Sequence, residues 1–348
     1  SDLLNSIQVG PSKIGASDTD PTRLTAETVT VNVNPLEALF TAKLGLNITV
    51  AEANGYLQQD PEKGWLNVDI PEQEDDNKDN KFKIRLEKLR VRDSFLTLVP
   101  VSKAGALLEP IPVENLNGQV NVDPITVDGE EAQRTRFELS GNPTGGGDLS
   151  LKGEVQPLPQ DEVTAADAND GVKDLDNAAN GSSDNLDNTS DEPQNAIATN
   201  LLIQAKDAPV ADILRFTLAS ISIPTDTVDI TSGIVSGSVD LQFRPNEPVD
   251  YSGSLSVDKT SLVTEAIPLP VENIAGETQF QDNKWTVDRL NATYGEIDAA
   301  AKGLVDFDSG YALDVATKDV SVDNFVATTG LELPVPVVGN FDATAQVR

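Results

Sequence analysis

The chain has 348 residues and a formal net charge of −32, and it contains no His, Cys or Met. These absences exclude Ser-His-Asp and Cys-His nucleophilic centres, disulfides, and zinc or haem sites built on imidazole or thiolate. The acidic balance argues against a nucleic-acid partner, because phosphate binding requires clustered Lys and Arg. We therefore expect a protein with no enzymatic activity, no catalytic residue, no metal and no cofactor.

The composition favours a slender, β-rich protein. Only 38% of the residues are hydrophobic and 5% aromatic, which is thin for a large spherical core, whereas the abundant Val, Ile, Thr and Ser suit half-buried strands. No stretch approaches the roughly 20 apolar residues of a membrane-spanning helix, and the N-terminal region does not resemble a signal peptide. Because an initiator Met is also missing, we expect an excised part of a longer protein; if that protein is anchored in a membrane, the anchor lies outside this chain.

Two features precede the first long strand pattern. The segment PLEALFTAKLG at 35–45 predicts a helix near 35–44, since Pro is favoured in the first helical turn and Gly ends the pattern. The segment EQEDDNKDN at 72–80 predicts an exposed acidic loop.

Alternation of apolar and polar residues dominates the remaining chain and predicts strands with one apolar face. The segment KFKIRLEKLRVRDSFLTLVP at 81–100 is typical, and Gly, Pro, Asn and Asp separate it from similar segments. We predict that the apolar positions line a continuous face, namely Phe82, Ile84, Leu86, Val120, Val122, Leu149, Leu151, Val239, Leu241, Phe243, Leu255, Val257, Leu313 and Val315.

The same segment carries the main local reversal of charge. Its cations are Lys81, Lys83, Arg85, Lys88, Arg90 and Arg92. Two interpretations of this cluster remain open. It is either the solvent-exposed face of amphipathic strands, or a surface that binds anionic lipid headgroups or an acidic partner.

One sequence motif occurs twice in the chain. PIPVENLNGQV at 110–120 and PLPVENIAGET at 268–278 are identical at six of eleven positions. Pro fixes φ, and Asn and Gly favour turns, so we predict a strand-turn-strand corner that recurs in successive modules. This interpretation assigns no ligand contact to Glu114 or Glu272.

An acidic segment divides the chain. Residues 158–195 contain ten acidic residues, the single base Lys173 and no aromatic residue, which predicts a disordered insert. We therefore predict one continuous array of β modules, with residues 1–157 before the insert and residues 196–348 after it.

Two further helices are predicted in the second part. DAPVADILRFTLAS at 207–220 has a possible N-cap at Asp207 and predicts a short helix near 209–219. SVDNFVATTGLELPVP at 321–336 is a weaker counterpart. In both cases a Pro-containing segment and then a Gly-spaced strand follow.

Two short motifs resemble catalytic signatures but favour turns. GNPTGGGD at 141–148 lacks the Lys-Ser/Thr of a phosphate loop, so we predict a hairpin connection. FDSGY at 307–311 contains the Asp-Ser-Gly of aspartic proteases only once, whereas that mechanism needs two carboxylates, so a β-turn is predicted.

Two stretches carry a family resemblance. The first is VNVNPLEALFTAKLGLNITVAEANGYLQQDPEKGWLNVDIPE running into KFKIRLEKLRVRDSFLTLVP, and the second comprises PVADILRF, IPTDTVDITSGIVSGSVDLQF and VDNFVATTGLELPVPVVGNFDATAQV. Both resemble the AsmA-like region of the TamB family, particularly its cyanobacterial branch and a chloroplast inner-envelope relative. The resemblance covers nearly all of residues 20–157 and 196–348, and its motifs are structural.

The resemblance implies an all-β fold in which an elongated, bent sheet forms an open apolar groove, called a β-taco or repeating β-groove, with a few short helices. It also implies a periplasmic location, an inner-membrane anchor N-terminal to this segment, and contact with an Omp85-type barrel such as TamA or BamA through a C-terminal region. Members of the family are implicated in outer-membrane protein assembly and in phospholipid movement between membranes.

Three functions remain open at this stage. A one-sided apolar sheet with few helices to cover it suits acyl chains, which gain about 0.8 kcal/mol for each buried methylene, so a lipid-carrying bridge segment is the first hypothesis. The second is a scaffold that holds unfolded outer-membrane β-strands by β-augmentation. The third is an adhesin or stalk built from β-sandwiches with closed cores.

Overall fold

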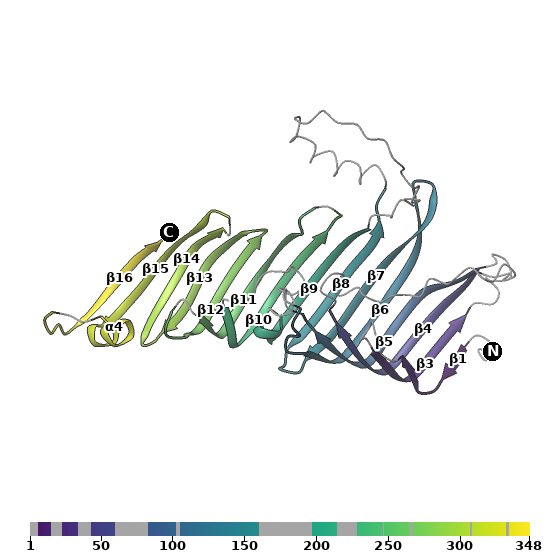
Figure 1. Ribbon diagram of the computed structural model, residues 1–348, viewed down its shortest axis with the longest axis horizontal. Helices are drawn as coiled ribbons and strands as arrows, with labels where there is room; N and C mark the ends of the chain where they lie inside the picture. The colour runs from purple at the N-terminus through teal and green to yellow at the C-terminus, as the bar shows by residue number, and fades with distance from the viewer. Residues whose placement is uncertain are drawn as a thin grey trace, which may run out of the picture.

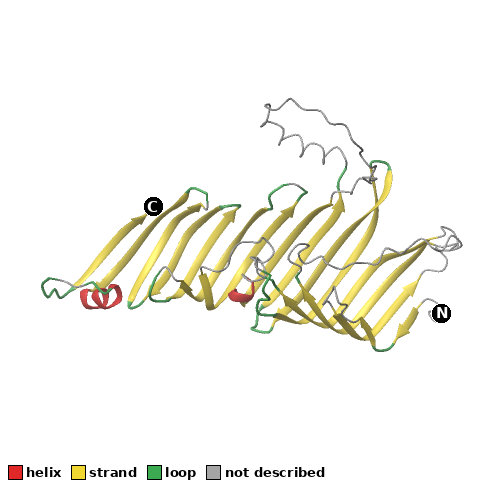
Figure 2. Cartoon of the chain, in the orientation of Figure 1, coloured by secondary structure: helices red, strands yellow, loops and turns green. Residues whose placement is uncertain are grey.

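The fold is a single long β-sheet. The computed structural model describes residues 6–14, 23–33, 43–59, 83–101, 105–159, 197–213, 228–245, 247–264, 267–306, 308–331 and 334–348. Figures 1 and 2 show the strands side by side along the long axis, with the N-terminal strands at one end and the C-terminal strands at the other. The all-β class predicted from the alternation is confirmed, and the sheet is open.

The strands follow one another across the sheet in chain order. Their bounds are β1 (Ser6–Val9), β2 (Ser12–Ile14), β3 (Arg23–Val33), β4 (Lys43–Gln58), β5 (Lys83–Val99), β6 (Ile111–Val127), β7 (Glu130–Pro143), β8 (Asp148–Pro157), β9 (Ile197–Pro209), β10 (Val228–Phe243), β11 (Asp250–Thr264), β12 (Val271–Gln281), β13 (Lys284–Tyr294), β14 (Ile297–Asp306), β15 (Gly310–Ser321) and β16 (Asn340–Val347). Strand β2 also pairs with β3. Neighbours are antiparallel except β4 and β5, which run parallel.

The sheet is continuous across the predicted acidic insert. Strands β8 and β9 pair directly, from Asp148 opposite Lys206 to Pro157 opposite Ile197. Residues 160–196, which hold most of the predicted insert, lie outside the described residues, as do Lys81, Phe82 and the predicted loop at 72–80. Strands from both predicted parts of the chain therefore belong to one sheet.

The helix predictions have mixed outcomes. Helix α4 (Val322–Thr329) lies within the segment predicted as helical at 321–336; Ser321 is its N-cap, and Gly330 ends it with a φ of 67°. In the predicted helix near 209–219, residues 210–213 are helical, and the rest lies outside the described residues. Asp207 is not its cap, because pairing with β10 keeps β9 extended through Pro209.

The predicted helix near 35–44 is wrong at its C-terminal end. Lys43, Leu44 and Gly45 belong to β4, where they pair with β5, and residues 34–42 lie outside the described residues. Cross-strand hydrogen bonding therefore overrides the helical pattern at this point.

Both predicted turn motifs are turns. Residues 144–147 connect β7 to β8, and residues 308 and 309 lie between β14 and β15. In the second turn the Asp306 carboxylate accepts hydrogen bonds from the backbone N–H groups of Asp308 and Ser309, at 3.0 and 3.3 Å. Hydrogen bonding by Ser309, first through its side chain, and by Asp308 lowers the pKa of Asp306 below its ordinary value.

In both copies, 110–120 and 268–278, the repeated motif forms a β-bulge inside a continuous strand. The predicted strand-turn-strand corner is therefore wrong. Asn115 in β6 and Asn273 in β12 have left-handed φ values of 51° and 54°. The pairing register shifts beside each of them, between Glu114 and Asn117 and between Glu272 and Ala275. Asn tolerates the left-handed region better than most residues, which explains the choice of residue.

Similar bulges occur in several other strands. The left-handed residues that coincide with a register shift are Asp93, Asn115, Asp207, Lys259, Asn273 and Asp319. Three of them are held by the next strand: the backbone N–H of Asp93 donates to Asn117 Oδ1, that of Asp207 to Ser236 Oγ, and that of Asp319 to Asp342 Oδ1, at 3.1, 2.9 and 2.8 Å. Bulges of this kind bend the strands that contain them.

Candidate functional site: the apolar face of the sheet

One face of the sheet carries rows of apolar residues, because residues paired across neighbouring strands point to the same side. The longest row, called row 1 here, is Val9, Val29, Val50, Val91, Gly118, Leu139, Leu151, Ile203, Val239, Gly253, Phe280, Trp285, Val305 and Tyr311. A parallel row 2 is Ile7, Val31, Ile48, Leu89, Val120, Phe137, Gly153, Leu201, Leu241 and Tyr251.

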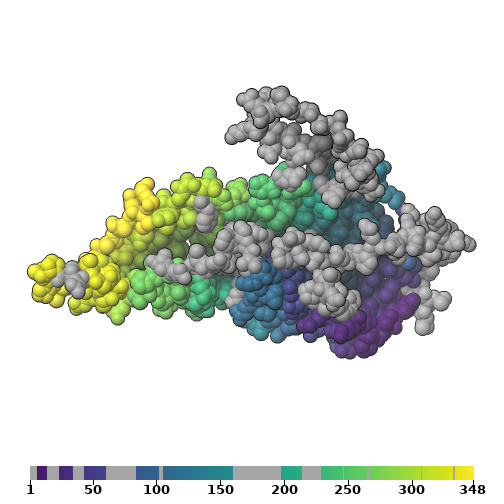
Figure 3. All heavy atoms as spheres, viewed as in Figure 1, coloured from purple at the N-terminus to yellow at the C-terminus, as the bar shows by residue number. Residues whose placement is uncertain are grey.

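The burial of row 1 changes along the molecule. Val9 in the edge strand β1 is 47% exposed, Ile203 and Val239 in the centre are 2% and 4% exposed, and Tyr311 in β15 is 50% exposed. Figure 3 shows how the chain progresses along this long axis from the N-terminal to the C-terminal strands. The side chains of row 1 are therefore most buried in the middle of the sheet and most exposed towards its two ends.

The first central cluster joins β9, β10 and β12. Its buried members are Ile203, Val239, Leu241 and Phe280, and partly buried neighbours include Leu149, Leu151, Phe243 and Leu255. Leu241 is completely buried. Burying side chains of this size contributes about 1.5–3 kcal/mol each, so this cluster is a major source of stability for the sheet.

Aromatic rings extend this cluster toward the C-terminal strands. Phe280 stacks on Trp285 with centroids 4.9 Å apart, and Tyr251 lies 6.2 Å from Phe280. The Tyr251 hydroxyl donates to Asn283 Oδ1 at 3.1 Å. Burial raises the pKa of Tyr251, and the carboxylates of Asp282 and Asp308 raise it further.

A helical turn covers the second cluster. Val210 and Ile213, from the turn at 210–213, are buried with Ala208 and Val235. Leu149, Ala205, Ile230, Leu255 and Val257 pack against this group. Here the chain itself closes part of the apolar face.

The third cluster lies in the N-terminal half. Leu98, Ile111 and Val113 of β5 and β6 are buried, and Leu57, Leu96 and Leu116 pack against them. Beside it, the buried Ser94 hydroxyl donates to the Arg92 carbonyl at 2.8 Å and accepts from the Ala53 N–H at 3.1 Å. The cluster therefore lies next to the bulge at Asp93.

The predicted lining residues share this face wherever they are described. Pairing places Ile84 opposite Leu44, Leu86 opposite Leu46, and Leu313 opposite Gly303, and the two-residue spacing places the others in or beside the two rows. Ile84 is 55% exposed, whereas Val239 and Leu241 are buried in the core.

Several central residues of the face were missed by the sequence interpretation. Ile203, Phe280, Trp285 and Leu89 belong to the rows but not to the predicted set. The segment ETQFQDNKWTV alternates as clearly as the chosen ones, so the same signal identifies Phe280 and Trp285. Leu89 follows a register shift in β5, which disguises its alternation with Leu86.

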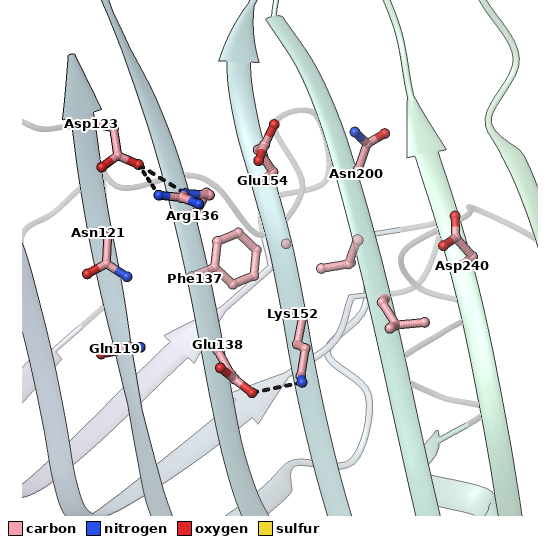
Figure 4. A pocket seen from close by; sticks show the side chains of 13 residues that line it. Gln119, Asn121, Asp123, Arg136, Phe137, Glu138, Lys152, Glu154, Asn200 and Asp240 are labelled. Carbon is pink, nitrogen blue, oxygen red and sulfur yellow. Dashed lines mark hydrogen bonds and ion pairs between the residues drawn. The ribbon is translucent and has the colours of Figure 1, made fainter. Parts of the chain in front are cut away.

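Two hollows in the described part of the chain are lined mainly by polar side chains of the opposite face. The larger, of about 660 Å³, spans β6 to β10 and contains the ion pairs Arg136–Asp123 and Lys152–Glu138, at 2.7 and 2.8 Å (Figure 4). Its remaining carboxylates include Glu154 and Asp240. Both cations that line this hollow are paired with carboxylates, so neither is left free to bind an anion.

The described residues contain neither a metal-binding cluster nor a membrane-spanning helix. Among these residues, no group of three or more His, Cys, Asp or Glu is placed to hold a metal ion. No helix of the same described set has the length and apolar character needed to cross a bilayer. Comparisons with protein-family models, with curated proteins and with solved structures find no significant match to this chain.

Proposed function

We propose that this chain is a segment of a TamB-like bridge that carries phospholipid acyl chains along its apolar face. In this proposal the segment lies in the periplasm, an N-terminal anchor holds the longer protein in the inner membrane, and a C-terminal region meets an Omp85-type barrel. The observation that carries the proposal is row 1, which runs from Val9 in β1 to Tyr311 in β15 on one side of the sheet.

Energetics support an acyl ligand over a polar one. Row 1 and row 2 offer methyl, methylene and aromatic surface over successive strands, and each methylene that leaves water on such a surface contributes about 0.8 kcal/mol. The exposed members towards the ends, such as Val9 and Tyr311, leave apolar area that a chain can cover. The headgroup stays in water at the rim, which avoids the cost of burying its charge.

A scaffold for outer-membrane β-barrel proteins is the second candidate. Among the described strands, β16 pairs only with β15, and β1 pairs only with β3. A strand with a free edge presents unpaired N–H and C=O groups, and an extended polypeptide binds to such an edge by β-augmentation. An adhesin built from β-sandwiches fits less well, because the described strands form one sheet.

Site-specific crosslinking tests the proposal. A benzophenone amino acid is introduced at Leu255 or Leu313, which lie on the apolar face and are only partly buried. The matched controls are Ser254 and Asp314, the adjacent exposed residues of the same strands, whose side chains point to the polar face. We expect phospholipid adducts, identified by mass spectrometry, at the first pair only.

The outcomes separate the candidates. Lipid adducts at all four positions, or at none, contradict a lipid-carrying face. Adducts with unfolded barrel proteins at the edges β1 and β16, without lipid at Leu255 or Leu313, favour the scaffold instead.

A further inference from the structure

The polar face of β5 carries a line of cations. Lys88, Arg90 and Arg92, named the β5 cation stripe here, occupy alternate positions and therefore point to the same side, opposite Leu89 and Val91 of the apolar rows. Successive members are about 7 Å apart along the strand, twice the rise per residue. Arg90 and Arg92 are exposed, and Lys88 is half-buried.

The stripe has no carboxylate in the cross-strand positions beside it. Lys88 lies between Asn47 of β4 and Asn121 of β6, and Arg90 lies between Thr49 and Gln119. Arg92 faces Ala51 of β4. Among the described residues, none of the three cations makes an ion pair.

Several cations elsewhere on the sheet have acidic neighbours. Arg136 and Lys152 form ion pairs with Asp123 and Glu138. Lys206 is paired across strands with Asp148, and Lys302 with Asp314. Since acidic residues outnumber Lys and Arg by 57 to 25, a line of three cations whose cross-strand neighbours are neutral is unusual in this chain.

The surroundings of the stripe favour a lipid surface over a protein. The paired neighbours Asn47, Thr49, Gln119 and Asn121 supply hydrogen-bonding groups, and no aromatic or large apolar side chain occupies these positions. Protein interfaces draw most of their binding energy from such apolar or aromatic anchors, whereas headgroup binding requires charge and hydrogen bonds alone.

On the same strand, Glu87 precedes the stripe and Asp93 follows it. The Glu87 carboxylate forms an ion pair with Arg85 at 3.1 Å and accepts a hydrogen bond from Asn47 at 3.5 Å, so its charge is already offset by a cation outside the stripe. Salt limits electrostatic reach to about 8–10 Å, which weakens the effect of more distant acidic residues.

We propose that the β5 cation stripe docks the polar face of the sheet onto an anionic bilayer surface. Lys88, Arg90 and Arg92 contact phosphate and other anionic headgroup oxygens, and the neighbouring amides and hydroxyl complete the hydrogen bonds. This contact lies on the opposite side of the sheet from the apolar rows. It therefore stands whether or not those rows hold acyl chains.

Vesicle flotation tests the docking surface. The probes are vesicles of equal parts phosphatidylglycerol and phosphatidylcholine, and vesicles of phosphatidylcholine alone. The triple variant Lys88→Gln, Arg90→Gln, Arg92→Gln is compared with Lys206→Gln, Lys302→Gln, Lys318→Gln, which changes the net charge equally at exposed positions of the same face. Circular dichroism confirms that both variants keep the β-sheet signal and melting temperature of the parent.

We expect the parent to bind only the anionic vesicles, and increasing NaCl to weaken this binding. A cation near an anionic surface contributes about 1 kcal/mol, so affinity falls roughly fivefold for each stripe residue removed and on the order of a hundredfold for all three. The control triple retains the parent affinity.

Three results overturn the proposal. Equal losses in both triple variants indicate a net-charge effect without a docking site, and unchanged binding of the stripe variant excludes the stripe. If polyglutamate binds the parent in a stripe-dependent way while the anionic vesicles do not bind, the partner is an acidic polypeptide.

Discussion

Phe280 and Trp285 face each other across the β12–β13 hairpin, with ring centroids 4.9 Å apart and planes inclined by 23°. Phe280 is 7% exposed and belongs to the central buried cluster, so the stacked pair joins the C-terminal hairpins to β9 and β10. The stacked pair therefore extends the central cluster by one further strand, from β12 to β13.

Replacing Phe280 with Ala should lower the free energy of unfolding by about 3–5 kcal/mol, because the change removes buried area and leaves a cavity. Phe280→Leu keeps most of the volume and should cost clearly less. Urea denaturation followed by tryptophan fluorescence and circular dichroism measures both. Equal stability of Phe280→Ala and the parent would contradict the assigned core.

The buried Ser94 hydroxyl predicts a second stability effect. In Ser94→Ala the Ala53 N–H loses its acceptor inside the protein, and an unsatisfied buried donor costs about 1–3 kcal/mol. Ser254, an exposed serine of β11, is the control, and Ser254→Ala should change stability by less than about 0.5 kcal/mol. Chemical denaturation of the two variants in parallel distinguishes a buried hydrogen bond from a general serine effect.

The bulge at Asn115 predicts opposite effects of two substitutions. Because its φ is 51°, Asn115→Gly should be neutral or slightly stabilising, whereas Asn115→Val should lose about 1–2 kcal/mol, as a β-branched residue is strained in the left-handed region. Asn273 should respond in the same direction, since its φ is 54°. If Val is tolerated at both positions, the bulge is absent in solution.

Gly118, in the first copy of the repeated motif, lies where the neighbouring strand leaves no room for a side chain. A Cβ at this position would collide with the Glu138 carbonyl oxygen and the Leu139 backbone, so Gly118→Ala should destabilise the sheet by about 1–3 kcal/mol. At Gly10 an added Cβ meets no atom within 4 Å, and Gly10→Ala should leave the melting temperature unchanged. Thermal unfolding of the two variants compares a crowded glycine with a free one.

Tyr251 predicts an alkaline dependence of stability. Its pKa is raised in the folded protein, so the stabilisation from the protonated phenol is fully present below the unfolded pKa near 10 and is lost as pH rises through the folded pKa. Tyr251→Phe cannot ionise, and the difference in unfolding free energy between parent and variant should shift in favour of the variant above about pH 10. A difference that stays constant across this range would contradict the raised pKa.

Alternation predicts the apolar face because it is a local property. Val239 and Leu241 are two residues apart, and no distant information is needed to place them on the same side of β10. The bulges are different, because a left-handed residue is recognisable as a bulge only when its pairing partner is known. The sequence around Asn115 suggested a turn for this reason, although β6 continues through it.

The helix near Asp207 shows the same limit. Its residues favour an N-cap, but the Asp207 N–H donates to Ser236 Oγ of β10, and this cross-strand bond extends β9 to Pro209. The cation stripe was visible as a cluster in the sequence. Its neutral cross-strand neighbours were not, since Asn47, Thr49, Gln119 and Asn121 come from two other strands.

The bulges also help to fix the register of neighbouring strands as the sheet assembles. Strands that alternate apolar and polar residues can slide by two positions and still present the same face, so alternation alone leaves many alignments nearly equivalent. A two-residue slip between β9 and β10 would separate the Asp207 N–H from Ser236, and a slip between β15 and β16 would separate the Asp319 N–H from Asp342. Each bulge thus favours one alignment of its strand pair. Strands that share the same alternating pattern therefore fold into a sheet with a single register.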